Sequence, residues 1–113
     1  MTVLICGSTG RLGRSVTSFF RKQTKVVAPT RNEIDFTSKE ALRDLIEAEK
    51  PVTVINCAAW TDVDGCEKNP ELAKKLNTDL PQHLSELIEK IDSHLIQIST
   101  DFVFDGQTDK PYN

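Results

Sequence analysis

The sequence has few cysteines and no long hydrophobic run. Its three cysteines are widely spaced and form no CxxC pair, which argues against a disulfide framework or a metal site and predicts reduced thiols in a cytoplasmic protein. The longest apolar runs, Val3–Cys6 and Val26–Ala28, are far too short to cross a bilayer, so no membrane partner is expected. The chain also begins directly with a strand pattern and no basic segment, which predicts no signal peptide.

An excess of basic residues is also lacking. Fourteen Lys and Arg oppose seventeen Asp and Glu, for a net charge of −3, and the basic residues are scattered rather than arranged in a stripe. We therefore expect no nucleic-acid partner. The content of 38% hydrophobic and 27% charged residues is typical of a soluble globular chain. A length of 113 residues allows one domain at most, spanning residues 1–113.

What the sequence does contain is an alternation of short apolar runs and helical patterns. Continuous apolar runs predict strands that are covered on both faces, and apolar residues three or four apart predict helices. The strands are expected at 3–6, 26–28, 52–57 and 95–99. The first helix is expected at 11–22, and the second runs from a capping box of Thr37 and Glu40 to about Glu49. The third begins at Asn69-Pro70 and is expected to kink or break at Pro81.

This order, β-α-β-α-β-α-β, predicts an α/β fold. Repeated crossover connections favour a Rossmann-like, doubly wound parallel sheet, here its N-terminal portion, with strand order 3-2-1-4. In that arrangement the fourth strand is an edge, yet Leu95, Ile96 and Ile98 make it apolar. A further strand or a partner chain, such as a second copy in a homodimer, is expected to cover it.

A glycine-rich segment follows the first predicted strand. Gly7, Gly10 and Gly13 form a GxxGxxG pattern that leads into a helix. Gly7 would permit a tight turn, Gly10 would let the backbone approach a pyrophosphate, and Gly13 would let the helix pack on the strand. The helix start then offers free N–H groups to an anion. We interpret the segment as a dinucleotide site; the alternative is a tight turn without a ligand.

The end of the second strand bears on cofactor choice. NAD sites usually carry an acid there, whereas this chain has Thr30 and Arg31. Arginine pairs well with a 2′-phosphate, so NADPH is expected rather than NADH. The alternative is that Arg31 is a solvated charge and Thr30 tolerates either cofactor.

Several motifs together resemble a known family. The GxxGxxG spacing resembles the extended short-chain dehydrogenase/reductase superfamily. Three further stretches, 35–37 (DFT), 56–64 (NCAAWTDVD) and 99–106 (STDFVFDG), are similar to the D-[IFL]-T, NxAAxTxVD and STDYVFDG patterns of the dTDP-4-dehydrorhamnose reductase family. This chain departs from the family at Phe102, where tyrosine is usual, and at Trp60, where His or Tyr is commoner.

The resemblance implies an activity and a set of roles. The family transfers hydride from NADPH to the C4 ketone of dTDP-6-deoxy-L-lyxo-4-hexulose, which gives dTDP-L-rhamnose. By position, it implies pyrophosphate contacts for Gly10, Arg11 and Leu12, adenine contacts for Asp35 and Phe36, and a nicotinamide-ribose path along Ala59, Trp60 and Thr61. It also implies a catalytic hydroxyl at Thr100 and a substrate contact at Asp101, and the small Ala58 and Ala59 would let the cofactor lie close to the backbone. The alternatives are turn caps for Asp35 and Asp101 and a core or interface anchor for Trp60.

One element that the family's reaction needs is absent from these residues. The superfamily's proton donor is the tyrosine of a YxxxK motif, but the single tyrosine here is Tyr112 and no lysine follows it. The residues of a sugar-nucleotide domain are also missing. We therefore expect the 113 residues to be an incomplete reductase without turnover of their own.

Two other readings stay open. The regulatory β subunit of methionine adenosyltransferase is similar over the same motifs and acts as a partner protein. Another nucleotide-sugar reductase or epimerase of the same superfamily is also possible, because substrate determinants lie further along the chain in this fold.

Overall fold

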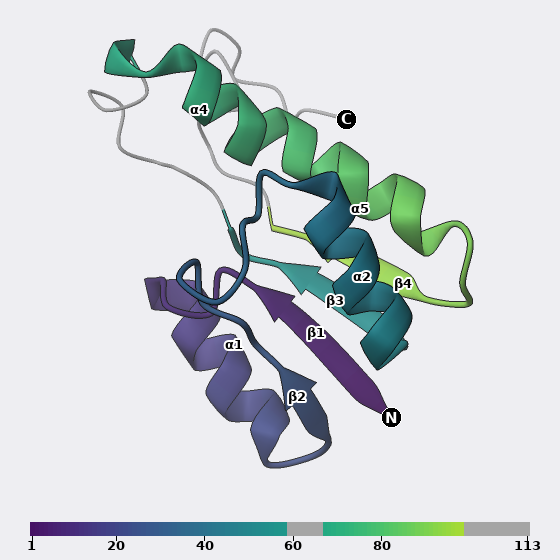
Figure 1. The fold of residues 1–113 in the computed structure, drawn as a ribbon. Coiled ribbons are helices and arrows are strands. Elements are labelled where there is room, and N and C mark those ends of the chain that lie inside the picture. Colours follow the sequence, from purple (N-terminus) through teal and green to yellow (C-terminus); the bar gives the residue numbers. More distant parts are fainter. Residues whose placement is uncertain (59–66, 99–113) are drawn as a thin grey trace, which may run out of the picture.

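The computed structural model describes residues 1–58 and 67–98, which form a four-stranded parallel sheet with helices packed on it (Figure 1). The strands are β1 (Thr2–Cys6), β2 (Lys25–Val27), β3 (Thr53–Asn56) and β4 (His94–Gln97). The helices are α1 (Arg11–Arg21), α2 (Lys39–Glu49), α4 (Pro70–Lys74), a π-helical turn η1 (Lys75–Asp79) and α5 (Leu80–Ile88). The predicted α/β, Rossmann-like fold is confirmed.

The strand order is β2-β1-β3-β4, which differs from the expected 3-2-1-4. The third strand lies beside β1 rather than beyond β2, with Ile5 opposite Ile55 in the parallel register. Burial explains this placement. Val54 and Ile55 are both buried and need a layer on each face, whereas β2 is only three residues long and begins at the exposed Lys25. A short strand with a charged end is suited to an edge.

Alternating strand residues divide the core into two layers. Leu4 and Val54 face α2 and α5, and Ile5 and Ile55 face α1. The larger cluster joins the first of these faces to buried residues of the helices and of the preceding loop, namely Phe36, Leu42, Ile46, Leu80, Leu84 and Leu87. The sheet is therefore covered on both faces, as continuous apolar strands require.

The N-cap of α2 is Ser38, one residue later than the predicted Thr37. The Oγ of Ser38 accepts a hydrogen bond from the Ala41 N–H at 3.1 Å. Thr37, the expected cap, instead donates its hydroxyl to Asp35 Oδ1 at 2.6 Å. The capping-box prediction was therefore wrong in its residue, because two neighbouring hydroxyl residues fit the same pattern and the fold of the preceding turn selects between them.

The third helical region begins as predicted, with Asn69 at the N-cap and Pro70 in the first turn. Pro81 does not break it. The π-helical turn η1 comes immediately before α5, and Pro81 then lies in the first turn of α5. The helix continues through this point, because the π-helical turn carries the chain into α5 with the Leu80 N–H bonded to the carbonyl of Lys75, and the proline that follows the turn has no N–H that needs a partner.

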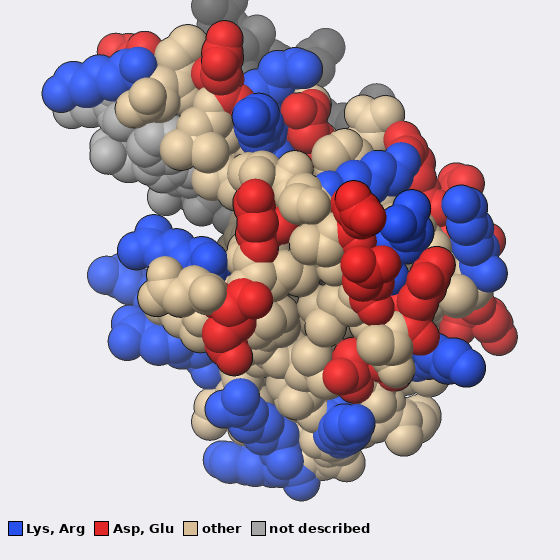
Figure 2. Space-filling view, viewed as in Figure 1, with Lys and Arg blue, Asp and Glu red and all other residues tan. Residues whose placement is uncertain are grey.

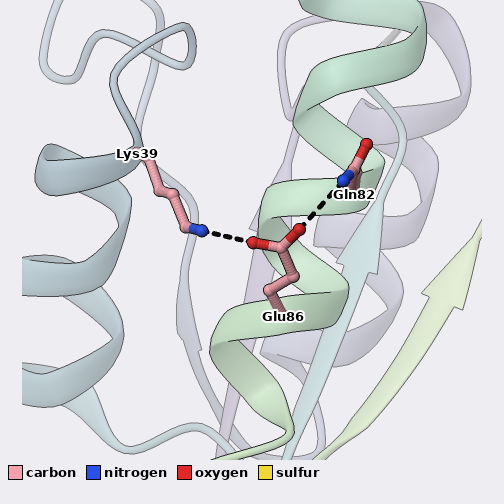
Figure 3. Close-up of polar contacts among 3 residues, drawn as sticks. All are labelled: Lys39, Gln82 and Glu86. Carbon is pink, nitrogen blue, oxygen red and sulfur yellow. Dashed lines mark hydrogen bonds and ion pairs between the residues drawn. The ribbon is translucent and has the colours of Figure 1, made fainter.

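A polar contact joins the two helices on the larger core face (Figure 3). Lys39 on α2 forms an ion pair with Glu86 on α5, and Gln82 Nε2 donates to the other carboxylate oxygen of Glu86 at 3.0 Å. The bond from Lys39, followed by that from Gln82, lowers the pKa of Glu86. Both side chains are partly exposed to solvent, so the contact contributes little to stability compared with the buried apolar residues of the two helices.

Strand β4 is the other edge of the sheet in the described residues. Ile96 is 47% exposed, and His94 and Gln97 are also exposed. Within residues 1–58 and 67–98, no helix has the length and apolar character needed to cross a membrane.

Candidate functional site

The candidate site lies where β1 and β3 end side by side. After β1 the chain turns to α1 on one face of the sheet, and the β3 to β4 connection carries α5 on the other face. In open α/β sheets, ligands bind in the crevice that such a change of direction leaves at the carboxyl ends of the strands. The backbone segments that lie at this point of the sheet are Gly7–Gly10 and Cys57–Ala58.

Two glycines of the loop are required by the protein's own packing. Gly7 has a φ of +78°, and a Cβ there would lie 2.5 Å from the backbone nitrogen of Ala58. A Cβ on Gly13 would lie 1.8 Å from the carbonyl oxygen of Gly7. These glycines let β3 and α1 approach the loop closely, which is a reason for glycine that involves no ligand.

Gly10 is different. Its φ of −73° and ψ of 172° suit any residue, and the nearest heavy atom to an added Cβ, the carbonyl oxygen of Gly7, is 3.6 Å away. The residue is exposed. Packing within the described residues therefore does not explain why this position is glycine, whereas a ligand that lies against the helix start would explain it.

The start of α1 is open to an anion. Gly10 is its N-cap and supplies no side-chain bond, and the first turn of the helix contains no acid. By contrast, α2 has the Ser38 cap and Glu40 in its first turn. The first N–H groups of α1 thus keep their partial positive charge available. Leu12 beside them is 47% exposed, an unusual position for a large apolar side chain.

The distribution of charge around α1 also favours an anionic ligand. Residues 1–32 contain six Arg and Lys and no acid, so all seventeen Asp and Glu follow. Figure 2 shows basic side chains gathered over α1, whereas acidic and basic side chains mix over α2 and α5. This surface favours a negatively charged ligand near the glycine loop.

The loop after β2 reaches the same region. Ser8 in the glycine loop donates its hydroxyl to the carbonyl of Ala28 at 3.3 Å, which joins the two loops. Thr30 is half-buried and Arg31 is exposed. The predicted ribose selectors therefore lie on a segment that is bonded to the glycine loop.

Sequence reasoning missed Glu33 in this loop. Its Oε1 accepts the backbone N–H of Thr30 at 2.9 Å. Thr30 lowers the pKa of Glu33, first through this backbone bond and then through its hydroxyl. The signal was present as the T-x-x-E spacing of residues 30–33, which is the capping-box pattern.

The two predicted adenine neighbours differ in accessibility. Asp35 is exposed and accepts bonds from the Thr37 N–H at 2.9 Å and from its hydroxyl, and these bonds lower the pKa of Asp35. Phe36 is only 7% exposed and belongs to the core cluster. Its ring therefore contributes chiefly to packing, while the carboxylate of Asp35 stays at the surface.

At the end of β3, Asn56 organises the border of the crevice. Its side chain is fully buried; Oδ1 accepts from the Ala58 N–H at 3.0 Å and Nδ2 donates to Gln97 Oε1 at 2.8 Å. The amide thus fixes Ala58 against Gly7 and connects β3 to β4. It is a positioning residue that the sequence motif contained without showing its role.

The remaining predicted residues, namely Ala59, Trp60, Thr61, Thr100 and Asp101, lie outside the described residues. The structure brings the following predicted residues to one end of the sheet: Gly7, Gly10, Arg11, Leu12, Gly13, Thr30, Arg31 and Ala58. Phe36 belongs to the core cluster, and the adenine contacts of Asp35 and Phe36 stay predictions.

The two described cysteines near the crevice are not poised as nucleophiles. Burial, and secondarily the neighbouring Cys57, raises the pKa of Cys6 to about 12. Burial also raises the pKa of Cys57. Both therefore stay as neutral thiols near pH 7.

A parallel α/β sheet with a glycine turn and an uncapped helix start at its switch point defines a Rossmann-like protein, a fold class in which dinucleotides commonly bind at this point. The comparison with family models agrees and is more specific. The RmlD substrate binding domain model matches residues 1–113, and the chain belongs to that family.

Individual relatives support the assignment. The chain is 39% identical to a dTDP-4-dehydrorhamnose reductase of Streptomyces griseus over 96% of this chain and 36% of the relative. It is similar to the crystal structure of a dTDP-4-dehydrorhamnose reductase from Clostridium acetobutylicum (37% identity, TM-score 0.91, 99% of this chain and 40% of that one). It also resembles the Bacillus anthracis dTDP-4-dehydrorhamnose reductase solved in complex with NADP (27% identity, TM-score 0.87, 96% and 39%). The chain thus spans about two fifths of the length of these relatives.

Proposed function

We propose that this chain is the cofactor-binding part of an NADPH-dependent dTDP-4-dehydrorhamnose reductase. The complete enzyme would reduce the C4 ketone of dTDP-6-deoxy-L-lyxo-4-hexulose to give dTDP-L-rhamnose in the cytoplasm. The observation that carries the proposal is Gly10, an exposed glycine at an uncapped helix start that the packing of the described residues does not require. The reductases among its relatives, one of them solved with NADP, support the specific reaction.

In this proposal the described residues hold the cofactor. The N–H groups at the start of α1 bind the pyrophosphate, with Gly10 leaving room for it and Leu12 lying beneath it. Arg31 and Thr30 face the 2′-phosphate, because a guanidinium matches phosphate geometry. Ala58 borders the path toward the nicotinamide ribose, where its small side chain permits close approach.

The bound cofactor would supply the hydride. Thr100 is proposed to donate a hydrogen bond to the C4 oxygen, a bond that strengthens as negative charge develops there. Asp101 is proposed to contact the sugar. The 113 residues contain no YxxxK proton donor, so this portion by itself would bind nucleotide without turnover.

The proposal also concerns the sheet edge. The half-exposed Ile96 on β4 supports the idea that further chain or a second copy covers this strand. A dTDP-sugar would bind only in the complete protein, on residues that follow these in the fold.

Titration with NADPH tests the cofactor proposal. Calorimetry should give binding to the wild-type chain, and amide NMR should show shifts across Gly7–Gly13. Gly10→Asp should abolish binding, because its carboxylate would occupy the anion position. The same substitution should leave stability unchanged or raised, because aspartate is a good N-cap.

A matched control separates charge from position. Ser18→Asp adds the same charge at an exposed position further along α1 and should retain most of the affinity. Unchanged NADPH affinity in Gly10→Asp would contradict the cofactor assignment.

A further inference from the structure

The Glu33 carboxylate accepts hydrogen bonds from Thr30, the residue that precedes Arg31. The bond from the Thr30 N–H is 2.9 Å long, and the Thr30 hydroxyl also bonds to the carboxylate. The backbone closes the same turn, because the Glu33 and Ile34 N–H groups both donate to the Thr30 carbonyl, at 3.0 and 3.1 Å. The carboxylate is thus fixed beside Thr30 by a short, locally bonded loop.

This loop lies next to the glycine loop rather than apart from it. Ser8 donates to the carbonyl of Ala28, two residues before Thr30. Arg31 is exposed, and the ion pairs within residues 1–58 and 67–98 do not include it. The Glu33 carboxylate therefore bonds to Thr30 instead of neutralising Arg31, and the loop presents a cation and an anion side by side.

We propose that Glu33 is a specificity-determining residue that limits the preference of this site for NADPH over NADH. The inference rests on the proposed cofactor function. Glu33 competes with a 2′-phosphate for the two Thr30 donors and places a like charge beside that phosphate. A 2′-hydroxyl carries no charge and can itself donate to a carboxylate, so NADH does not meet this penalty.

The exposure of Glu33 to solvent limits how strongly it can change the preference for NADPH. Glu33 lies at the surface, where interactions between charges are weakened by water and by salt. Its bonds to Thr30 hold its pKa below the usual value, so the carboxylate is ionised at neutral pH. The penalty on NADPH should therefore be modest and should decrease as salt is added.

Glu33→Gln tests the inference, because it removes the charge and keeps an acceptor for the Thr30 N–H. Dissociation constants for NADPH and for NADH are measured by calorimetry with the full chain at low and high salt. The NADPH preference should rise about two- to fivefold in Glu33→Gln at low salt, and the rise should shrink at high salt. NADH affinity should change little.

Glu40→Gln is the matched control, since it neutralises an exposed acid in the first turn of α2 and should leave the preference unchanged. If both nucleotides bind but Glu33→Gln leaves their ratio unchanged or favours NADH, Glu33 has only a structural role in its turn and the inference is overturned. If wild-type chain binds neither nucleotide, the cofactor proposal itself fails, and the inference fails with it.

Discussion

The carbonyl oxygen of Gly7 lies where a side chain on Gly13 would have to be, 1.8 Å from the position of its Cβ. The first turn of α1 therefore packs directly on the turn that ends β1. This contact fixes the helix start at the carboxyl ends of β1 and β3. The three glycines therefore differ in why glycine is needed. Gly7 and Gly13 allow backbone segments to pack closely, whereas Gly10 leaves open space at the surface of the loop.

The first prediction concerns Gly13→Ala. The added methyl group would collide with backbone, which cannot move aside as a flexible side chain can. We expect a loss of about 2 kcal/mol or more in the free energy of unfolding, measured by urea denaturation.

Gly10→Ala is the comparison for this prediction. Its Cβ meets only ordinary contact, so the loss should come from alanine being a poorer N-cap than glycine and should be about 1 kcal/mol or less. Equal destabilisation by the two substitutions would contradict the packing explanation.

Asn56→Ala should destabilise the sheet at the crevice. The substitution leaves the Ala58 N–H without its acceptor and opens a small cavity at a fully buried position. The expected cost is about 1–3 kcal/mol. Urea denaturation measures it, and hydrogen exchange should show faster exchange of the Ala58 amide.

Asn32→Ala is a matched control, because Asn32 is an exposed asparagine and its loss should cost less than about 0.5 kcal/mol. If Asn56→Ala matches the control, the buried amide does not hold β3 in place.

The thiols should react in a fixed order. Cys6 is buried with a pKa of about 12, whereas Cys57 is only half-buried and its pKa is raised to a lesser extent. In a Cys66→Ser variant at about pH 8, iodoacetamide should modify Cys57 before Cys6, because the thiolate is the reactive form. Peptide mass spectrometry gives the order; faster modification of Cys6 in the native protein would contradict it.

The Lys39 and Glu86 contact should contribute to acid sensitivity. The folded pKa of Glu86 lies below its ordinary value of 4.5. Its contribution to stability is therefore present above that value and is lost as the pH falls through the folded pKa. Lys39→Met should reduce the difference in Tm between about pH 7 and about pH 3, measured by circular dichroism.

Lys90→Met provides the comparison, since it removes an exposed lysine outside this contact. The difference should also shrink in wild-type protein at high salt, because the pair is exposed to solvent. An unchanged pH difference in Lys39→Met would show that the pair adds nothing to folding.

Several features of the fold were predictable because their signals are local. The four strands and the start of α1 were found within one or two residues, since apolar runs and helical spacing report burial directly. Asn69 and Pro70 marked the start of α4 for the same reason. The cap of α2 was misassigned by one residue, because spacing does not distinguish Thr37 from Ser38 when both carry a hydroxyl.

The candidate site also combines features that the sequence determined with features that only the tertiary structure decided. The amino-acid sequence by itself determined the class of fold, the position of the glycine loop and the family resemblance, since each is written in spacing along a short segment. Only the tertiary structure decided that β3 lies beside β1, that Phe36 is buried in the core, that Glu33 bonds to Thr30, and that Asn56 holds Ala58 at the end of β3. These features depend on which surfaces meet after the chain crosses the sheet, and burial and hydrogen bonding between distant segments select that arrangement.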